Sequence, residues 1–117
     1  MTKLIYIAHP YTSHGTPEEN YQKVDTICKH IINNEPNIVP ISPIHTFNFF
    51  PPTGDQTQVI KMCLCLLSQC EEIRFYGPWQ NSFGCRQEMR HAIENNKPIK
   101  ELPYPNNIDN KNNEVAV

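Results

Sequence analysis

Short runs of β-branched and aromatic residues alternate with helix-start signals along most of this chain, and no other feature of the sequence restricts its fold as strongly. The runs are residues 3–8, 37–41, 71–77 and 97–100. Strands that alternate with helices are typical of a parallel sheet, because a parallel strand rejoins the sheet only through a right-handed crossover. The order predicts an α/β fold, namely a small doubly wound, flavodoxin- or Rossmann-like parallel sheet of four to five strands with helices on both faces.

Three helices are expected between these strands. The first follows a capping box with proline at the first helical position (residues 16–19), and its apolar residues recur at helical spacing until about residues 33–34. The second covers residues 56–70 and is apolar over more than half of its surface, which indicates burial by a partner subunit as well as by the sheet. The third runs from Ser82 to about Asn95.

The length of 117 residues corresponds to one domain with enough core to fold alone. We expect the domain to span residues 1–101, and the asparagine-rich residues 102–117 to form a flexible or partner-contacting tail. A net charge of -2 gives no electrostatic basis for binding a nucleic acid polymer. No apolar run approaches the length of a membrane-spanning helix, so no membrane partner is expected.

Five cysteines, an odd number, fit reduced thiols better than a disulfide framework, and the N-terminal residues 1–8 are too short for a signal peptide. We therefore expect a cytoplasmic protein. The cysteines do not form a zinc pattern, because the sequence has no C-x-x-C pair and helical spacing places Cys63 and Cys65 on different faces. No metal and no other cofactor is expected.

The start of the third helix carries the pattern that points most directly to chemistry. Ser82 is a good N-cap, and the first helical N–H groups after it lie at the positive end of the helix dipole, where a phosphate binds well. Gly84 and Glu88 are four residues apart and share one helix face, so the missing side chain leaves room above the carboxylate. A ligand with its phosphate on the helix tip would place a reactive carbon against Glu88. A capped surface helix with an ordinary glutamate has the same pattern.

Further candidates follow the ends of the strands. In an open α/β sheet the ligand crevice is lined by the loops at the carboxyl ends of the strands. His9 and Tyr11 follow the first strand, His45 follows the second and Trp79 follows the third. We expect these four side chains to contact a ligand.

The long loop of residues 42–54 is rich in aromatics and proline, and such loops often cover a site. Phe47, Phe49 and Phe50 are suited to stack on a base or to pack against the domain or a second subunit, and packing is expected for two of the three.

The motifs of several large enzyme classes are absent from the sequence. It has no GxxxxGK[ST] of a P-loop NTPase, no GxGxxG of a dinucleotide dehydrogenase and no nucleophilic serine elbow. A lone carboxylate beside a sugar phosphate suggests attack at an anomeric carbon. Such a carboxylate traps the sugar covalently and then releases it to water or to another acceptor.

Two motifs, YIAHPY at residues 6–11 and S-x-G-x-x-x-E at residues 82–88, resemble the nucleoside 2-deoxyribosyltransferase superfamily, most closely a small branch associated with phages and bacteria. The resemblance covers roughly residues 3–100. It implies that Glu88 is a nucleophile forming a glycosyl-enzyme intermediate. It also implies that Ser82 contacts the 5′ end of the sugar, where serine accompanies 5′-monophosphate substrates. Members are usually dimers or larger, so a homodimer or higher homo-oligomer is expected.

Two main hypotheses follow. The first is an N-glycosidase or deoxyribosyltransferase acting on a (deoxy)nucleoside 5′-monophosphate, with Ser82 and Gly84 as the phosphate site and Tyr6, His9 and Tyr11 as sugar or base contacts. The second is a non-catalytic module that holds a nucleotide-like ligand, such as a signalling nucleotide. It is favoured by the long aromatic loop and by a departure from the family that the motifs resemble: the acidic residue that commonly handles the base there is not evident after the third strand, at residues 76–79. A third hypothesis is an assembly protein with a vestigial site.

Overall fold

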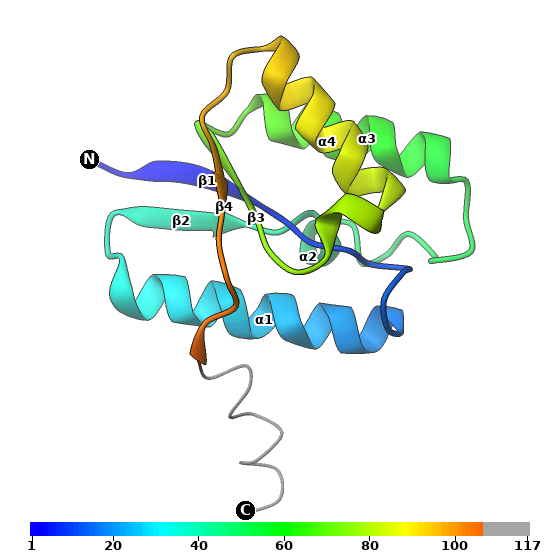
Figure 1. The fold of residues 1–117 in the computed structure, drawn as a ribbon, viewed down its shortest axis with the longest axis horizontal. Coiled ribbons are helices and arrows are strands. Elements are labelled where there is room, and N and C mark those ends of the chain that lie inside the picture. Colours follow the sequence, from blue (N-terminus) through cyan, green and yellow to red (C-terminus); the bar gives the residue numbers. More distant parts are fainter. Residues whose placement is uncertain (107–117) are drawn as a thin grey trace, which may run out of the picture.

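The sheet of the computed structural model, which describes residues 1–106, has four parallel strands in the order β2-β1-β3-β4 (Figure 1). The strands are β1 (Lys3–Ala8), β2 (Ile38–Ile41), β3 (Glu72–Phe75) and β4 (Ile99–Glu101). The chain passes from β1 outward to β2 and then returns to β3 on the other side of β1. This reversal is a topological switch point, and ligands of such sheets bind there, beyond the carboxyl ends of the strands. The prediction of a small parallel α/β sheet is confirmed.

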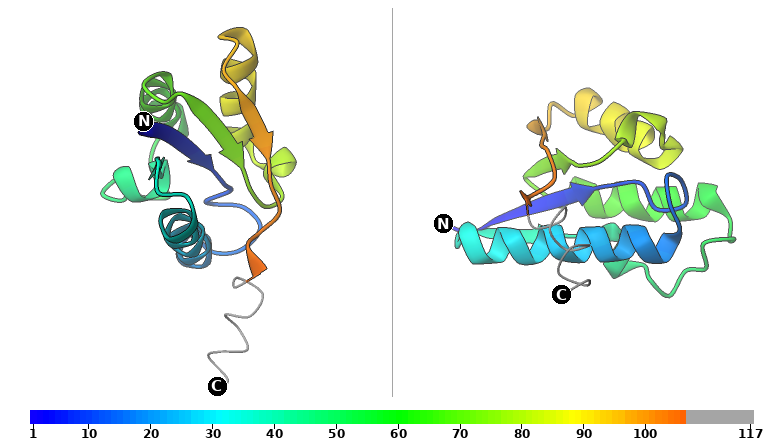
Figure 2. Two further views of the ribbon diagram at one scale, coloured as in Figure 1. Left: turned by 90° about the vertical axis from the view of Figure 1, so that its left-hand side faces the viewer. Right: turned by 60° about the horizontal axis from the view of Figure 1, so that its bottom comes forward.

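Helices cover both faces of the sheet (Figures 1 and 2). They are α1 (Pro17–Asn34), α2 (Pro43–Thr46), α3 (Gln56–Ser68) and α4 (Phe83–Glu94), with the 3-10 turn η1 (Trp79–Asn81) before α4. Helix α1 lies on one face, and α3 and α4 lie on the other. Among the described residues, no helix is both long and apolar enough to cross a bilayer.

The alternation of side chains along β1 builds a core on each face. Ile5 and Ile7 pack with Val24 and Ile27 of α1, whereas Tyr6 and the residues that share its face pack toward α3 and α4. Successive side chains of a strand point to opposite faces, so a central strand with both faces covered is apolar throughout. The second face therefore holds Tyr6 directly against α4.

The capping box at the start of α1 is present as expected. The Glu19 N–H donates to Thr16 Oγ1 at 3.1 Å, and the Thr16 N–H donates to Glu19 Oε1 at 2.8 Å. Two backbone N–H groups at the start of the helix, which have no partner within it, are satisfied in this way. The capping box therefore fixes the residue at which α1 begins, and with it the length of the loop after β1.

The segment after β2 differs from the expected continuous loop, because it opens with the short helix α2. Ser42 caps this helix by accepting the His45 N–H at 3.2 Å, and Pro43 occupies the first helical position. Serine followed by proline is a helix-start signal, but the aromatic and proline-rich residues behind it favoured a loop. The second predicted helix is confirmed with an earlier end, at Ser68.

The packed domain extends past residue 101. The Leu102 N–H donates to the Phe75 carbonyl at 2.9 Å, and both Leu102 and Tyr104 pack against the core on the α1 face. Residues 107–117, the rest of the predicted tail, lie outside the described residues. The first residues of the segment predicted to be a flexible or partner-contacting tail therefore contact the domain itself.

A buried ion network ties β3 to the end of α1. Arg74 is 5 % exposed and binds Glu35 through both terminal nitrogens, at 2.9 and 3.0 Å, and Glu72 through Nε at 3.0 Å. Glu72 is also buried, and Lys100 Nζ lies 3.8 Å from it. Arg74 is therefore the main counter-charge of the buried Glu72 carboxylate.

We expect Arg74→Met to lower the free energy of unfolding by about 3 kcal/mol, because it leaves the buried Glu72 carboxylate without its main partner. Urea denaturation measures the change. The matched control is Arg90→Met, which removes an exposed 3.5 Å pair with Glu94 and should cost less than about 1 kcal/mol. Equal effects of the two substitutions would contradict this account.

Candidate functional site

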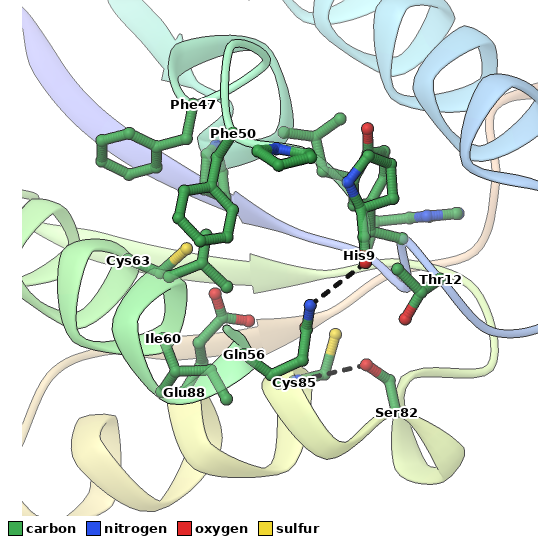
Figure 3. Close-up of a pocket in the computed structure, with 17 residues that line it drawn as sticks. His9, Thr12, Phe47, Phe50, Gln56, Ile60, Cys63, Ser82, Cys85 and Glu88 are labelled. Carbon is green, nitrogen blue, oxygen red and sulfur yellow. Dashed lines mark hydrogen bonds between the residues drawn. The ribbon is translucent and has the colours of Figure 1, made fainter. Parts of the chain in front are cut away.

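A cavity lies at the carboxyl edge of the sheet, beside the switch point. Its empty volume is about 740 Å³, the open mouth included. Four segments form its wall: the loop after β1, α2 with the loop that follows it, the first two turns of α3 and the start of α4 (Figure 3). These segments come from distant parts of the sequence, and the parallel topology brings them to one edge.

Glu88 points from α4 into this cavity (Figure 3). Its side chain is 6 % exposed, and the Tyr6 hydroxyl donates a hydrogen bond to Glu88 Oε2 from the sheet side. Because Tyr6 is fully buried in β1, the bond anchors the carboxyl group to the centre of the sheet. The carboxyl group is thus neither in bulk solvent nor closed inside the core.

Burial raises the pKa of Glu88 from 4.5 to about 7, and hydrogen bonds from Tyr6 and Cys85 lower it only in part. Burial therefore keeps the proton on Glu88 to a higher pH than on an ordinary glutamate. The cavity also contains the Cys63 thiol, whose pKa burial and the neighbouring Glu88 charge raise to about 12. Burial likewise raises the pKa of Cys85. Both thiols stay protonated and are therefore poor nucleophiles. Of these three side chains, Glu88 is the one that can act as a nucleophile.

The tip of α4 opens into the same cavity. The Ser82 Oγ accepts the Cys85 N–H at 3.3 Å, so the hydroxyl hydrogen is not used in this bond. A Cβ placed on Gly84 would meet no atom within 4 Å. The space expected above Glu88 is present, and an anion that enters it meets the positive end of the helix.

His9 lines the cavity with both ring nitrogens engaged. Nδ1 lies 2.7 Å from the Pro10 carbonyl oxygen and Nε2 lies 2.7 Å from the Tyr104 hydroxyl. Burial lowers the pKa of His9 to about 4. The ring is neutral at physiological pH and presents no free nitrogen to a ligand.

The structure brings together most of the residues that the sequence singled out. The cavity wall contains His9, Tyr11, Ser82, Gly84 and Glu88. Tyr6 lies behind Glu88 and acts on it, instead of lining the cavity.

His45 is not among the lining residues, because α2 turns it back toward α1. Its ring stacks on Tyr21 at 4.0 Å between centroids, its Nδ1 lies 2.7 Å from Ser42 Oγ, and its Nε2 lies 3.5 Å from Asp25. The side chain fastens α2 to α1, which is a structural role. Its neighbours in α2, Pro43 and Ile44, line the cavity instead.

Trp79 also lies outside the cavity. The turn η1 folds its ring over Phe75, at 4.8 Å between centroids, and its Nε1–H donates to Glu101 Oε1 at 3.0 Å. The expectation that Trp79 contacts a ligand did not take account of this turn, which directs the side chain toward β4.

Several lining residues were not identified from the sequence. They are Thr12, Gln56, Val59, Ile60, Cys63 and Cys85. The positions 56, 59, 60 and 63 share one face of α3, and this spacing is a signal. From the sequence, the large apolar surface of this helix is expected to be buried against the sheet and a partner subunit. In the structure, part of that surface faces the cavity.

Two of the three loop phenylalanines, Phe47 and Phe50, line the cavity, and this differs from the expectation that two of them only pack. Phe49 is 78 % exposed and meets Phe47 edge-on at 6.2 Å. The loop thus gives the cavity an aromatic side opposite the helix tip (Figure 3).

Comparison with known proteins gives a family without an assigned activity. Residues 3–102 match the family model described as "Domain of unknown function (DUF7768)". No curated protein matches the chain.

We expect Glu88→Gln to remove the loss of folding stability that the wild-type protein undergoes as the pH rises. The pKa of Glu88 is higher in the folded than in the unfolded state, so the folded state binds more protons between about pH 4.5 and 7 and wild-type stability falls as the pH rises through that range. The glutamine variant lacks this loss and should be more stable than wild type by about 2–3 kcal/mol at pH 8, and by little at pH 4.5.

Urea denaturation at both pH values measures the difference. The control is Glu94→Gln, which replaces an exposed glutamate of the same helix and should not reproduce the stabilisation at pH 8. A Glu88→Gln variant that is less stable than wild type at pH 8 would contradict the interpretation.

Proposed function

We propose a function for this chain from its site, because the chain belongs to a family described only as a domain of unknown function (DUF7768). The proposed activity is that of an N-glycosidase or deoxyribosyltransferase that cleaves the N-glycosidic bond of a (deoxy)nucleoside 5′-monophosphate, with Glu88 as the nucleophile. The observation that carries the proposal is the Glu88 carboxyl group, which is held by Tyr6 and faces a cavity beside an open helix tip.

The two ends of the cavity suit the two ends of a nucleotide. At the tip of α4, the Ser82 hydroxyl and the first helical N–H groups are donors for a phosphate. Thr12 faces the same opening (Figure 3). On the other side Phe50 and Ile60 offer an apolar surface to the flat face of a base. The sugar between these groups would place its anomeric carbon next to Glu88.

The chemistry needs an ionised carboxylate and no cofactor. A Glu88 oxygen attacks the anomeric carbon, the bond from that carbon to the base nitrogen breaks, and its electron pair leaves with the base, which takes a proton from water. Water then attacks the same carbon, the ester bond breaks, the electron pair returns to Glu88, and a proton passes to solvent. A second base in place of the water gives transfer instead of hydrolysis.

A binding module that holds the nucleotide without turnover is the second candidate, and the state of His9 favours it. Among the described lining residues, Glu88 is the one carboxyl group and His9 has no free ring nitrogen, so a general acid for the departing base is not evident.

A homodimer or higher oligomer and a cytoplasmic location stay predictions. Helix α3, where only Leu67 is fully buried, is the surface that an oligomer would cover.

A panel of ribo- and 2′-deoxynucleoside 5′-monophosphates tests the proposal by release of free base. We expect release by wild type and a loss of at least about a thousandfold in Glu88→Gln, because the amide is not a nucleophile. Since the carboxylate must be ionised, activity should rise with pH through about 7. In Tyr6→Phe that rise should move to higher pH, because the Tyr6 hydrogen bond lowers the pKa of Glu88.

Calorimetry on the same panel separates the candidates. Tight binding of a nucleotide that is recovered intact would favour the module. Neither binding nor release across the panel would leave both without support.

We expect Gly84→Ala to weaken nucleotide use without harming the fold. The methyl group meets no atom of the protein, and alanine favours a helix by up to about 1 kcal/mol over glycine, so stability should hold or rise. The same methyl group occupies the space proposed for the ligand, so the KM for the 5′-monophosphate should rise by about tenfold or more. Thermal denaturation and steady-state kinetics measure the two effects. An unchanged KM would show that the ligand does not occupy this space.

A further inference from the structure

A short segment after β4 reaches back to the cavity wall. We call residues 102–106 the C-terminal strap. It begins with the Leu102 backbone bond to Phe75, and Tyr104 packs against the core on the α1 face. The Tyr104 hydroxyl then meets His9, which directly follows β1 and lines the cavity. The strap therefore connects the C-terminal side of the domain to one wall of the site.

The contacts of His9 allow one assignment of its protons. The Pro10 carbonyl oxygen, 2.7 Å from Nδ1, only accepts, so Nδ1 carries a hydrogen and donates it. In the neutral ring Nε2 is then an acceptor, and the Tyr104 hydroxyl donates to it at 2.7 Å. Protonation of Nε2 is opposed by burial and by the charge of Lys23, whose Nζ lies 5.9 Å from the centroid of the Tyr104 ring.

Gly77 makes this contact possible. Its φ of +72° is unfavourable for other residues, and a Cβ there would collide with the Tyr104 hydroxyl and lie 3.0 Å from His9 Nε2. The turn after β3 thus leaves the gap in which the hydroxyl and the ring meet. Three segments that follow the carboxyl ends of β1, β3 and β4 converge on one hydrogen bond.

We propose that Tyr104 is a positioning residue of the nucleotide site, whose hydroxyl donates to Nε2 and so holds the His9 ring in one orientation in the cavity wall. This inference rests on the proposed function. Because His9 lines the cavity, a ring that was free to turn would change the shape of the wall that the ligand meets. Tyr104 holds the ring in place through Nε2 without touching the ligand, while burial and the charge of Lys23 oppose protonation of the ring.

The test uses Tyr104→Phe in the full chain, with Leu102→Ala as the matched control. The first variant removes the hydroxyl and keeps the ring, and the second weakens the packing of the strap and keeps the hydroxyl. Nitrogen-15 NMR of the His9 side chain, assigned by its loss in His9→Asn, is recorded from pH 5 to 8, together with KM and kcat for the nucleotide panel.

In wild type we expect a single Nδ1–H tautomer that does not titrate over this range. In Tyr104→Phe we expect the Nε2 signal of His9 to shift because its hydrogen-bond donor is lost, and a KM that rises about five- to tenfold with a smaller change in kcat, which is the size of one lost hydrogen bond. Leu102→Ala should leave the His9 spectrum and the KM unchanged even if the melting temperature falls.

An Nε2–H tautomer in wild type would overturn the proposal without any variant, which covers the case that Tyr104→Phe does not fold. An unchanged spectrum and KM in Tyr104→Phe would also overturn it, as would equal effects of Leu102→Ala. Failure of the proposed function looks different: wild type would then use no nucleotide while the His9 spectrum still depended on Tyr104.

Discussion

The hydrogen bond between Tyr6 and Glu88 joins the central strand of the sheet to the helix that carries the proposed nucleophile. Both residues are buried, and together they fix the carboxyl group at the base of the cavity. Burial sets the pKa of Glu88 near 7, whereas the Tyr6 bond limits that rise by stabilising the charged form. The same contact therefore fixes the position of the group and tunes its ionisation. The site is built at a cost in stability that the rest of the core offsets.

The thiols and the histidine that line this cavity are uncharged at neutral pH. The thiols of Cys63 and Cys85 stay protonated because burial raises the pKa of each, and His9 stays neutral because burial lowers its pKa. In such a cavity the tip of α4 is the place where a negative charge is favoured. One end of the cavity thus attracts an anion while the other end is aromatic and apolar, and Glu88 lies between them. This division is the reason for proposing a nucleotide, and not a simple anion or a simple hydrophobic ligand, as the occupant of the cavity.

Much of the site could be predicted from local patterns, and the exceptions have a common cause. Ser82, Gly84 and Glu88 are related by the geometry of one helix, so their spacing was enough to place them together. The direction of a side chain after a strand end depends on the next turn, and this is why His45 and Trp79 face away from the cavity. Gln56, Ile60 and Cys63 share a face of α3, yet whether that face meets the sheet, the cavity or another chain is a matter of packing.

The sequence by itself determined the order of strands and helices, the parallel sheet and the helix tip with its glutamate, because periodicity, caps and four-residue spacing are local properties. The tertiary structure alone decided how the groups ionise. Tyr6 is 82 residues from Glu88, and Tyr104 is 95 residues from His9. Burial and hydrogen bonds across such separations shift a pKa by stabilising one charge state, and no local pattern encodes which distant side chains will meet.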